Sequence, residues 1–179
     1  MATNICDRLR LGVTTPTAEE TRLLAAEWAA ALPADATVAL HGDLGAGKTT
    51  WVQGMARGFG IAGPVTSPTF TIYTLHRGGS RMLAHMDAYR LGSPGEADDL
   101  LLEEFLVSPW CLAVEWPDRV PAWIPRGAWH LDAEERCYRD AGHQAGLRGS
   151  CPAAVGFVQQ RPDRPYHLRG RRFERDMRH

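Results

Sequence analysis

The sequence has few cysteines and no long apolar run, and each shortage removes a class of protein. Its four cysteines form no Cys-x-x-Cys pair and have no zinc-ligand spacing to the seven histidines, which argues against a zinc site and a disulfide framework. No apolar stretch approaches the ~20 residues of a membrane span. The first residues also lack the basic and apolar segments of a signal peptide. We therefore expect free thiols and a cytoplasmic protein with no membrane partner.

Lysine is almost absent as well. Nineteen of the twenty Lys and Arg residues are arginine, and the single lysine, Lys48, lies in Gly-Asp-Leu-Gly-Ala-Gly-Lys-Thr at residues 42–49. This is the GxxxxGK[ST] pattern of a phosphate-binding loop (P-loop, Walker A), in which backbone N–H groups surround phosphate and lysine reaches it as a compact charge. A chain that uses arginine elsewhere and lysine here indicates such a loop.

The segments beside the loop have the context that the motif requires. Residues 37–41 predict a buried strand, and residues 49–59 predict a helix that stops at two glycines. We expect Lys48 to contact the β- and γ-phosphates from a solvent-facing position, and the Thr49 hydroxyl to bind Mg²⁺. The nucleotide-binding assignment covers Gly42, Asp43, Leu44, Gly45, Ala46, Gly47, Lys48, Thr49 and Thr50. For Thr50, a plain helix position is an equal alternative.

The scarcity of asparagine bears on the base. GTPases of this fold read guanine with an Asn-Lys-x-Asp segment, but the only asparagine here is Asn4 and the only lysine lies in the loop. That guanine reader is therefore excluded, and ATP with Mg²⁺ is the expected ligand.

Two apolar segments after the loop each end in a carboxylate. Residues 82–87 and 111–115 predict buried strands that end at Asp87 and Glu115. Ligands of open α/β sheets bind beyond the carboxyl ends of the strands, so both acids are expected beside the phosphates. We assign Asp87 to the metal, and Glu115 to metal contact and to activation of the attacking water, two roles that the sequence does not separate. Capping of a turn at the strand end is the alternative for either acid alone.

A hydroxyl-rich segment, Thr66-Ser-Pro-Thr69, follows the P-loop helix. Loops at this place can sense a γ-phosphate and rearrange on hydrolysis, and we assign Ser67 and Thr69 to that role. A polar turn fixed by Pro68 is the alternative.

The first 132 residues otherwise predict alternating helices and strands, and hence a single α/β domain with a mainly parallel sheet flanked by helices. The expected elements are an edge strand within 5–13, a helix opened by a Thr17–Glu20 capping box and ended by Pro33, a strand at 70–75 and an acidic amphipathic helix at 96–106.

Residues 133–179 differ from the rest in charge and composition. Residues 1–132 carry a net charge of −5, whereas residues 133–179 carry +4 and are rich in Gly, Pro and Arg. Such a basic tail favours an irregular or poorly ordered end. We therefore divide the chain into a P-loop ATPase domain, 1–132, and an atypical tail, 133–179.

Four motifs together resemble the bacterial TsaE (YjeE) family of tRNA threonylcarbamoyladenosine biosynthesis ATPases. They are His-Gly-Asp-Leu-Gly-Ala-Gly-Lys-Thr-Thr at 41–50, Ser-Pro-Thr-Phe at 67–70, His-Met-Asp-Ala-Tyr-Arg-Leu at 85–91 and Val-Glu-Trp-Pro-Asp at 114–118. A P-loop alone occurs in thousands of proteins, but the four motifs in this order are far more specific. The resemblance covers roughly residues 10–130.

The resemblance implies a P-loop NTP hydrolase, stimulated by a partner, that acts in N6-threonylcarbamoyladenosine (t6A37) modification of tRNA. The implied partner is the TsaB–TsaD heterodimer, with tRNA involved indirectly and no role for DNA. Among the residues, it implies that Lys48 and Thr49 bind phosphate and Mg²⁺, that Asp87 is the Walker B acid, that Glu115 lies close to the metal and that Trp116 belongs to the nucleotide site. A core aromatic after a strand is the alternative for Trp116.

The C-terminal segment departs from the family pattern, which usually ends in alternating strands. Residues 128–132 could begin such a strand, but the sequence after them has no regular alternation of apolar and polar residues. One hypothesis is a reading-frame change after about residue 132, which would leave the last strands of the sheet missing.

Two other functions compete with the ATPase interpretation. A small P-loop metabolite kinase fits the length, but its Arg-bearing lid would have to come from residues 161–178. A nucleotide-dependent RNA-binding module would use the same basic tail and would show steep salt dependence.

Overall fold

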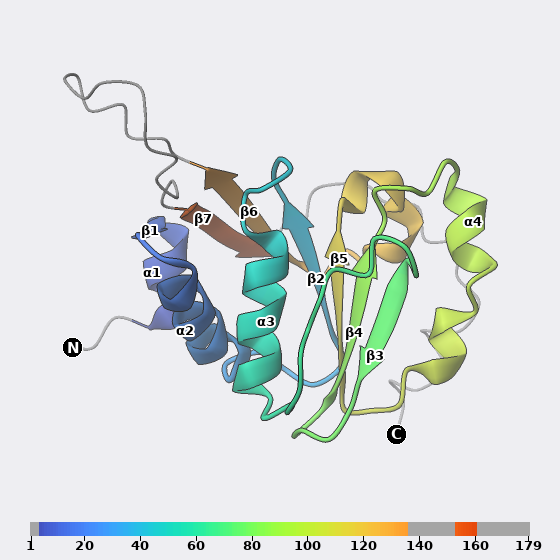
Figure 1. Cartoon of the computed structure of the whole chain (residues 1–179), viewed down its shortest axis with the longest axis horizontal. Coiled ribbons are helices and arrows are strands. Elements are labelled where there is room, and N and C mark those ends of the chain that lie inside the picture. The colour runs from blue at the N-terminus through green and yellow to red at the C-terminus, as the bar shows by residue number, and fades with distance from the viewer. Residues whose placement is uncertain (1–3, 136–152, 161–179) are drawn as a thin grey trace.

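One seven-stranded sheet runs through the computed structural model, which describes residues 4–135 and 153–160 (Figure 1). The strand order is β1-β7-β6-β2-β5-β4-β3. Neighbours among β6, β2, β5 and β4 are parallel, whereas β3 and β7 run antiparallel to the strands beside them. The strands are β1 (Val13–Thr15), β2 (Ala36–His41), β3 (Tyr73–His76), β4 (Met82–Asp87), β5 (Trp110–Glu115), β6 (Trp129–Glu135) and β7 (Ala153–Gln160). The expected α/β domain with a mainly parallel sheet is confirmed.

Helices cover both faces of this sheet (Figure 1). The helices α1 (Ile5–Arg10), α2 (Ala18–Ala29) and α3 (Lys48–Gly58) pack on one face. The other face is covered by α4 (Pro94–Asp98) and the 3₁₀ helices η1 (Leu102–Phe105), η2 (Pro117–Arg119) and η3 (Pro121–Trp123). Neighbouring residues of β2 show the division, since Val38 and Leu40 belong to the first core and Ala39 to the second. A strand buried on both faces explains the continuous apolar runs in the sequence.

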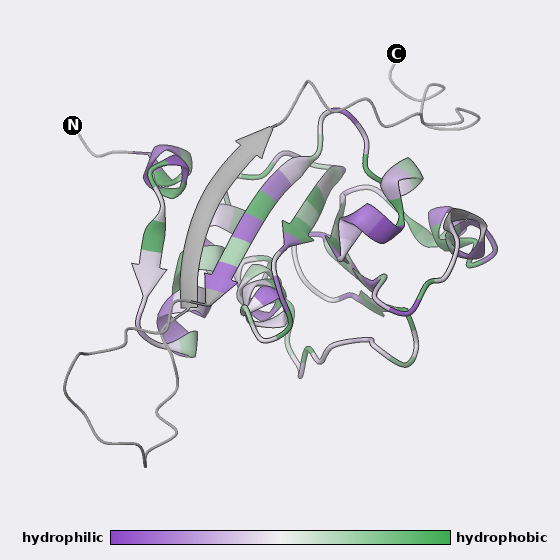
Figure 2. Cartoon of the chain, turned by 90° about the horizontal axis from the view of Figure 1, so that it is seen from above, coloured by the Kyte–Doolittle hydropathy of each residue, from purple (hydrophilic) through white to green (hydrophobic). Residues whose placement is uncertain are grey.

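Strand β6 does not have a continuous apolar run of this kind. Figure 2 shows hydrophilic and hydrophobic residues taking turns along this strand. Leu131 and Ala133 are buried, whereas Glu134 is exposed. This pattern indicates a strand nearer the margin of the sheet, with one face less covered than in β2.

Two glycines allow α3 to lie close against α2. A Cβ atom on Gly54 would overlap the carbonyl oxygen of Arg22, and one on Gly58 would lie 2.6 Å from the carbonyl oxygen of Ala26. The rings of Trp28 on α2 and Trp51 on α3 then pack against each other in a tilted arrangement, with ring centroids 5.6 Å apart. This contact fixes the helix that begins at the P-loop.

Several expected elements are present. The strands at 37–41, 82–87 and 111–115 and the helix at 49–59 correspond to β2, β4, β5 and α3 within one residue. The Thr17 hydroxyl accepts a hydrogen bond from the amide of Glu20 at 3.2 Å and so caps α2 as predicted. The helix ends at Ala29, however, before it reaches Pro33.

The N-terminal prediction is wrong. Residues 5–10 form helix α1 instead of an edge strand, and only Val13–Thr15 are extended. The side chain of Asn4 accepts a hydrogen bond from the Cys6 amide and caps the helix, while Ile5 and Leu9 are both buried on one face. Ile5 and Leu9 are four residues apart, which is typical of one face of a helix. The prediction of a strand within residues 5–13 did not take this spacing into account.

Two other elements are shorter than predicted. The strand expected at 70–75 begins only at Tyr73, because Ile72 has a positive φ of 67°. The helix expected at 96–106 is divided into α4 and η1 at Leu101, whose φ is 50°. Asp98 also accepts a hydrogen bond from the indole of Trp123 at 3.1 Å, which engages the end of α4 with another segment.

Residues 133–135 and 153–160, the described parts of the segment 133–179, belong to the same sheet. Strand β7 pairs antiparallel with both β6 and β1, so the sheet has a strand after β6. The frame-change hypothesis concerns the gene and stays a prediction. The arginines of the possible kinase lid and RNA-binding tail, at 161–178, lie outside the described residues, as do Cys137 and Cys151. Cys6 and Cys111 are free thiols. Among the residues that the structure describes, no helix is long and apolar enough to cross a membrane.

Candidate functional site

The P-loop connects the carboxyl end of β2 to the first turn of α3. Gly42, Gly45 and Gly47 have φ angles of 129°, 87° and 94°, which L-residues with side chains rarely adopt. Gly42 also passes so close to β6 that a Cβ atom would overlap the Ala133 carbonyl. The loop and the first turn of an 11-residue helix thus present backbone N–H groups at a helix N-terminus, an arrangement that fits an anion.

The single lysine lies inside this loop. Lys48 is only 4% exposed, and its ammonium donates hydrogen bonds of 2.7 Å to the carbonyl oxygens of Gly42 and Asp43. Nζ also lies 4.1 Å from the centre of the Trp116 ring. The prediction of a solvent-facing lysine is therefore wrong, because carbonyl oxygens and an indole surround the ammonium.

Burial and charge act on this ammonium in opposite directions. Burial lowers the pKa of Lys48 below its usual value, while the negative charges of Glu115, Asp87 and Asp43 raise it. Burial is the larger effect. The site therefore places the Lys48 ammonium beside three carboxylates, although burial removes water from it.

The two strand-end acids lie side by side. Asp87 of β4 and Glu115 of β5 are register partners, and each is 4% exposed. The Thr49 hydroxyl donates a hydrogen bond of 2.8 Å to Oε1 of Glu115. The predicted convergence of both acids with the P-loop is what the backbone register produces.

Asp87 holds the segment that we expected to act as a switch. Its Oδ2 accepts hydrogen bonds from Ser67 at 3.0 Å and Thr69 at 2.7 Å, and its Oδ1 accepts one from the Tyr89 amide at 3.1 Å. The hydroxyls of Ser67 and Thr69 lie 2.8 Å apart. The loop is therefore connected to the site through this carboxylate.

Trp116 follows directly after Glu115 and turns back over the loop. Its backbone has a positive φ of 58°, and its half-buried ring lies 5.1 Å from that of Tyr89 as well as over Lys48. The ring thus lies beside Lys48 and also packs against the second core of the sheet, so both interpretations of Trp116 describe part of its surroundings.

Two predicted site residues lie apart from this cluster. Leu44 is 83% exposed on the loop. Thr50 is half-buried on the first turn of α3, and no hydrogen bond of its side chain is found in the described part of the chain. The geometry gives neither side chain a polar role.

The donor set suits a hard divalent cation that shares its coordination with phosphate and water. Thr49, Glu115 and Asp87 supply only oxygen atoms, as Mg²⁺ prefers. Across residues 4–135 and 153–160, no group of three His, Cys, Asp or Glu side chains is placed to enclose a metal. Protein side chains would therefore supply only part of the octahedral ligand shell of Mg²⁺, and phosphate and water oxygens would supply the rest.

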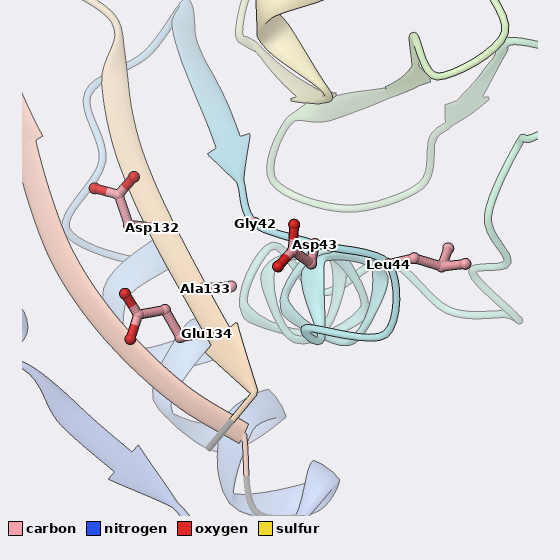
Figure 3. Close-up of a pocket in the computed structure, with 6 residues that line it drawn as sticks. All are labelled: Gly42, Asp43, Leu44, Asp132, Ala133 and Glu134. Carbon is pink, nitrogen blue, oxygen red and sulfur yellow. The ribbon is translucent and has the colours of Figure 1, made fainter. Parts of the chain in front are cut away.

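A hollow of about 690 Å³ lies between the P-loop and β6 (Figure 3). Its lining residues are Gly42, Asp43 and Leu44 of the loop and Asp132, Ala133 and Glu134 of β6. In Figure 3 Ala133 lies on the side of β6 that faces the loop, whereas the carboxylates of Asp132 and Glu134 lie on the other side and Leu44 extends away from β6. The lining contains acidic and no basic side chains, so this hollow does not suit phosphate. The amide side, toward Thr49 and Glu115, fits it better.

Sequence reasoning missed one polar residue of the site. His85 is fully buried on β4, and its Nε2 lies 2.9 Å from Oε1 of Glu115. The signal was present, because side chains two apart on a strand share a face and His85 stands two residues before Asp87.

Comparisons with known proteins agree on one family. The sequence model described as "Threonylcarbamoyl adenosine biosynthesis protein TsaE" matches residues 15–141. A Synechocystis protein named tRNA threonylcarbamoyladenosine biosynthesis protein TsaE is 46% identical over 94 residues, covering 50% of this chain and 59% of that protein. The Bacillus subtilis protein of the same name is 43% identical over 109 residues, covering 60% and 67%.

A solved structure is also similar to this chain over most of its length. The crystal structure of Bacillus subtilis YdiB is 31% identical, with a TM-score of 0.60 over 82% of this chain and 83% of that one. The chain spans about three fifths of the length of the first curated relatives that it matches.

Proposed function

The chain belongs to the TsaE family of threonylcarbamoyl adenosine biosynthesis proteins, and on this premise we propose that it is a Mg²⁺-dependent ATPase. The observation that carries the proposal is the hydrogen bond between the Thr49 hydroxyl and Glu115, beside a buried P-loop lysine. P-loop NTPases hold Mg²⁺ with the loop Ser or Thr and a strand-end acid, and here these two groups already touch.

Each residue of the site has a role in this proposal. The amides of residues 43–49 and Lys48 hold the phosphates, and Thr49 with Glu115 holds Mg²⁺. Bound Mg²⁺ would offset the charge that develops on the phosphates. Glu115 is also the candidate to orient the attacking water. Asp87 joins the loop of Ser67 and Thr69 to the metal side of the site.

We further propose that hydrolysis serves a protein complex in the cytoplasm. The complex is the TsaB–TsaD heterodimer of tRNA t6A modification, with tRNA involved indirectly. Leu44, Phe70 and Tyr89 support this, because these large apolar side chains are exposed on the segments that form the site. Large apolar side chains exposed on the segments of a site favour contact with another protein.

The test is Mg²⁺-dependent ATP hydrolysis, measured for the protein alone and with the purified TsaB–TsaD heterodimer. We expect slow turnover that rises when the heterodimer is added. Binding of ATP without hydrolysis under either condition would contradict the proposal, and phosphoryl transfer to a small alcohol would indicate a kinase.

Glu115→Gln tests the assignment of the acid. We expect the variant to bind ATP and to lose hydrolysis by roughly 100-fold or more, within the range for loss of a positioned acid–base group. Glu104→Gln is the matched control, because Glu104 is an exposed glutamate on η1. Turnover by the Glu115 variant equal to that of the control would show that the assignment is wrong.

A further inference from the structure

His85 is the one histidine in the described chain that contacts a proposed site acid. It lies on β4 and its side chain is fully buried, so its ring is held among neighbouring side chains. Its Nε2 and Oε1 of Glu115 are 2.9 Å apart, across two adjacent strands. A buried polar contact next to a proposed metal ligand raises the question of what it contributes.

The chemistry of the contact fixes its direction. A carboxylate oxygen only accepts hydrogen bonds, so Nε2 carries the proton and donates it. The other ring nitrogen, Nδ1, is buried without a hydrogen-bond partner among the described residues. The ring therefore has one polar attachment in this part of the chain, and that attachment is Glu115.

Both hydrogen bonds to the Glu115 carboxylate within the described part of the chain fall on the same oxygen. Thr49 donates to Oε1 at 2.8 Å and His85 donates to it at 2.9 Å. Two donors from different elements, α3 and β4, hold this oxygen from different directions. Oε2 is then the oxygen left for a metal or a water.

We propose that His85 is a positioning residue for Glu115, holding its carboxylate in the orientation that hydrolysis needs. The proposal rests on the proposed function, because it assigns His85 to the same reaction. A Mg²⁺ ion held by the Thr49 oxygen would leave the Thr49 O–H able to donate, so Thr49 and His85 together would keep Oε1 of Glu115 in place. Outer-shell partners of metal ligands act in this way and commonly alter activity by about 10- to 100-fold.

A purely structural histidine would behave differently. His76 offers the comparison, because it is a half-buried imidazole on the adjacent strand β3, and its Nε2 has no hydrogen-bond partner among the described residues. Thr74 of β3 is the register partner of His85, so their side chains lie on the same face of the sheet. His76 is two residues after Thr74 on β3 and therefore lies on that face too. A change at His76 alters packing near β4 without touching Glu115.

The experiment compares His85→Phe, His85→Gln and the control His76→Phe. Single-turnover hydrolysis and the affinity for a fluorescent ATP analogue are measured with Mg²⁺. We expect His85→Phe to lower the rate of hydrolysis by roughly 10- to 100-fold while the affinity changes less than about threefold. His85→Gln, whose amide places a donor near the former Nε2, should restore much of the rate, and His76→Phe should retain it.

A second measurement needs no nucleotide. Long-range ¹H–¹⁵N spectra of the free protein should show His85, identified by its absence in His85→Gln, with the proton on Nε2, and Glu115→Ala should change its Nε2 shift. If the wild type does not hydrolyse ATP, the proposed function fails while this measurement still tests the contact. Wild-type rates in His85→Phe, or equal losses in His85→Phe and His85→Gln, would overturn the positioning role.

Discussion

At the scale of single residues, Lys48 combines properties that usually exclude each other. It is buried, which disfavours its charge, yet it is surrounded by three acids that favour it. Its two carbonyl contacts replace part of the lost hydration. The free site thus holds a cation at a position where phosphate oxygens would be stronger partners than carbonyls.

The titration of Lys48 follows from this balance. We expect its pKa in the free protein to lie below that of the same lysine in the urea-unfolded chain, because burial is the larger influence. Between the two pKa values the unfolded state binds more protons, so stability rises with pH in that alkaline window. Because Lys48 is the only lysine, ¹³C-lysine labelling gives a single NMR signal to follow. Equal pKa values in the folded and unfolded chains would contradict the expectation.

Lys48→Arg tests why the chain keeps its one lysine here. The substitution preserves the charge, but the planar guanidinium is larger and cannot occupy the place of an ammonium between two carbonyls and an indole. We expect ATP binding to weaken at least about tenfold, roughly 1.4 kcal/mol, measured with a fluorescent analogue. Arg57→Lys, at an exposed position on α3, is the reciprocal control and should bind as the wild type does. Wild-type affinity in Lys48→Arg would refute this explanation.

At the scale of secondary-structure elements, the contact between α2 and α3 positions the P-loop. Gly54 and Gly58 are the points of closest approach, and their missing side chains bring backbone against backbone. An added methyl group at either position meets carbonyl oxygens, which cannot move aside as a flexible side chain would. Helix separation, and with it the direction of the first turn of α3, depends on these two residues.

Gly54→Ala and Gly58→Ala should therefore destabilise the protein, although alanine is the better helix former. We expect a loss of about 1–3 kcal/mol for each, the usual range for overpacking, in urea unfolding. Gly95→Ala on α4 is the matched control, because a Cβ there meets nothing within 4 Å. Unchanged stability in both α3 variants would show that the helices can separate without cost.

The sequence predicts the central elements better than the peripheral ones. Strands β2, β4 and β5 are buried on both faces, so their apolar runs have one interpretation, and the strand-end rule places Asp87 beside Glu115. Residues 5–10 and 96–106 border solvent, where a cap at Asn4 or a left-handed Leu101 decides the structure. A capping side chain or a single left-handed residue changes the apolar periodicity very little, so the periodicity does not predict where these helices begin or end.

Within the site, the limit of sequence reasoning is strand order. The acid that Thr49 touches is Glu115, because β5 is the neighbour of β2 and β4 lies one strand farther away. The order of parallel strands depends on how crossover connections pack, which no single segment encodes. The burial of Lys48 likewise depends on Trp116, whose positive φ turns its ring over the loop.

At the scale of the whole molecule, the sheet joins the two ends of the described chain. Strand β1 pairs only with β7 within the described residues, and β7 also extends the sheet from β6. The segment that composition set apart as a tail thus supplies the strand that attaches the N-terminal residues. Strand β6, in turn, contacts the P-loop at Gly42, so the margin of the sheet is connected to the site.

Truncation after residue 135 tests this arrangement, because it removes β7 and leaves β1 without a partner strand. We expect the melting temperature to fall by at least about 2–4 °C, the shift that accompanies a loss of 1 kcal/mol in a chain of this size. Hydrogen exchange should show loss of protection at Val13–Thr15, while β2, β4 and β5 keep theirs. Truncation after residue 160 is the control, since it retains β7. Unchanged protection of β1 in the shorter chain would mean that β7 does not hold the N-terminal residues.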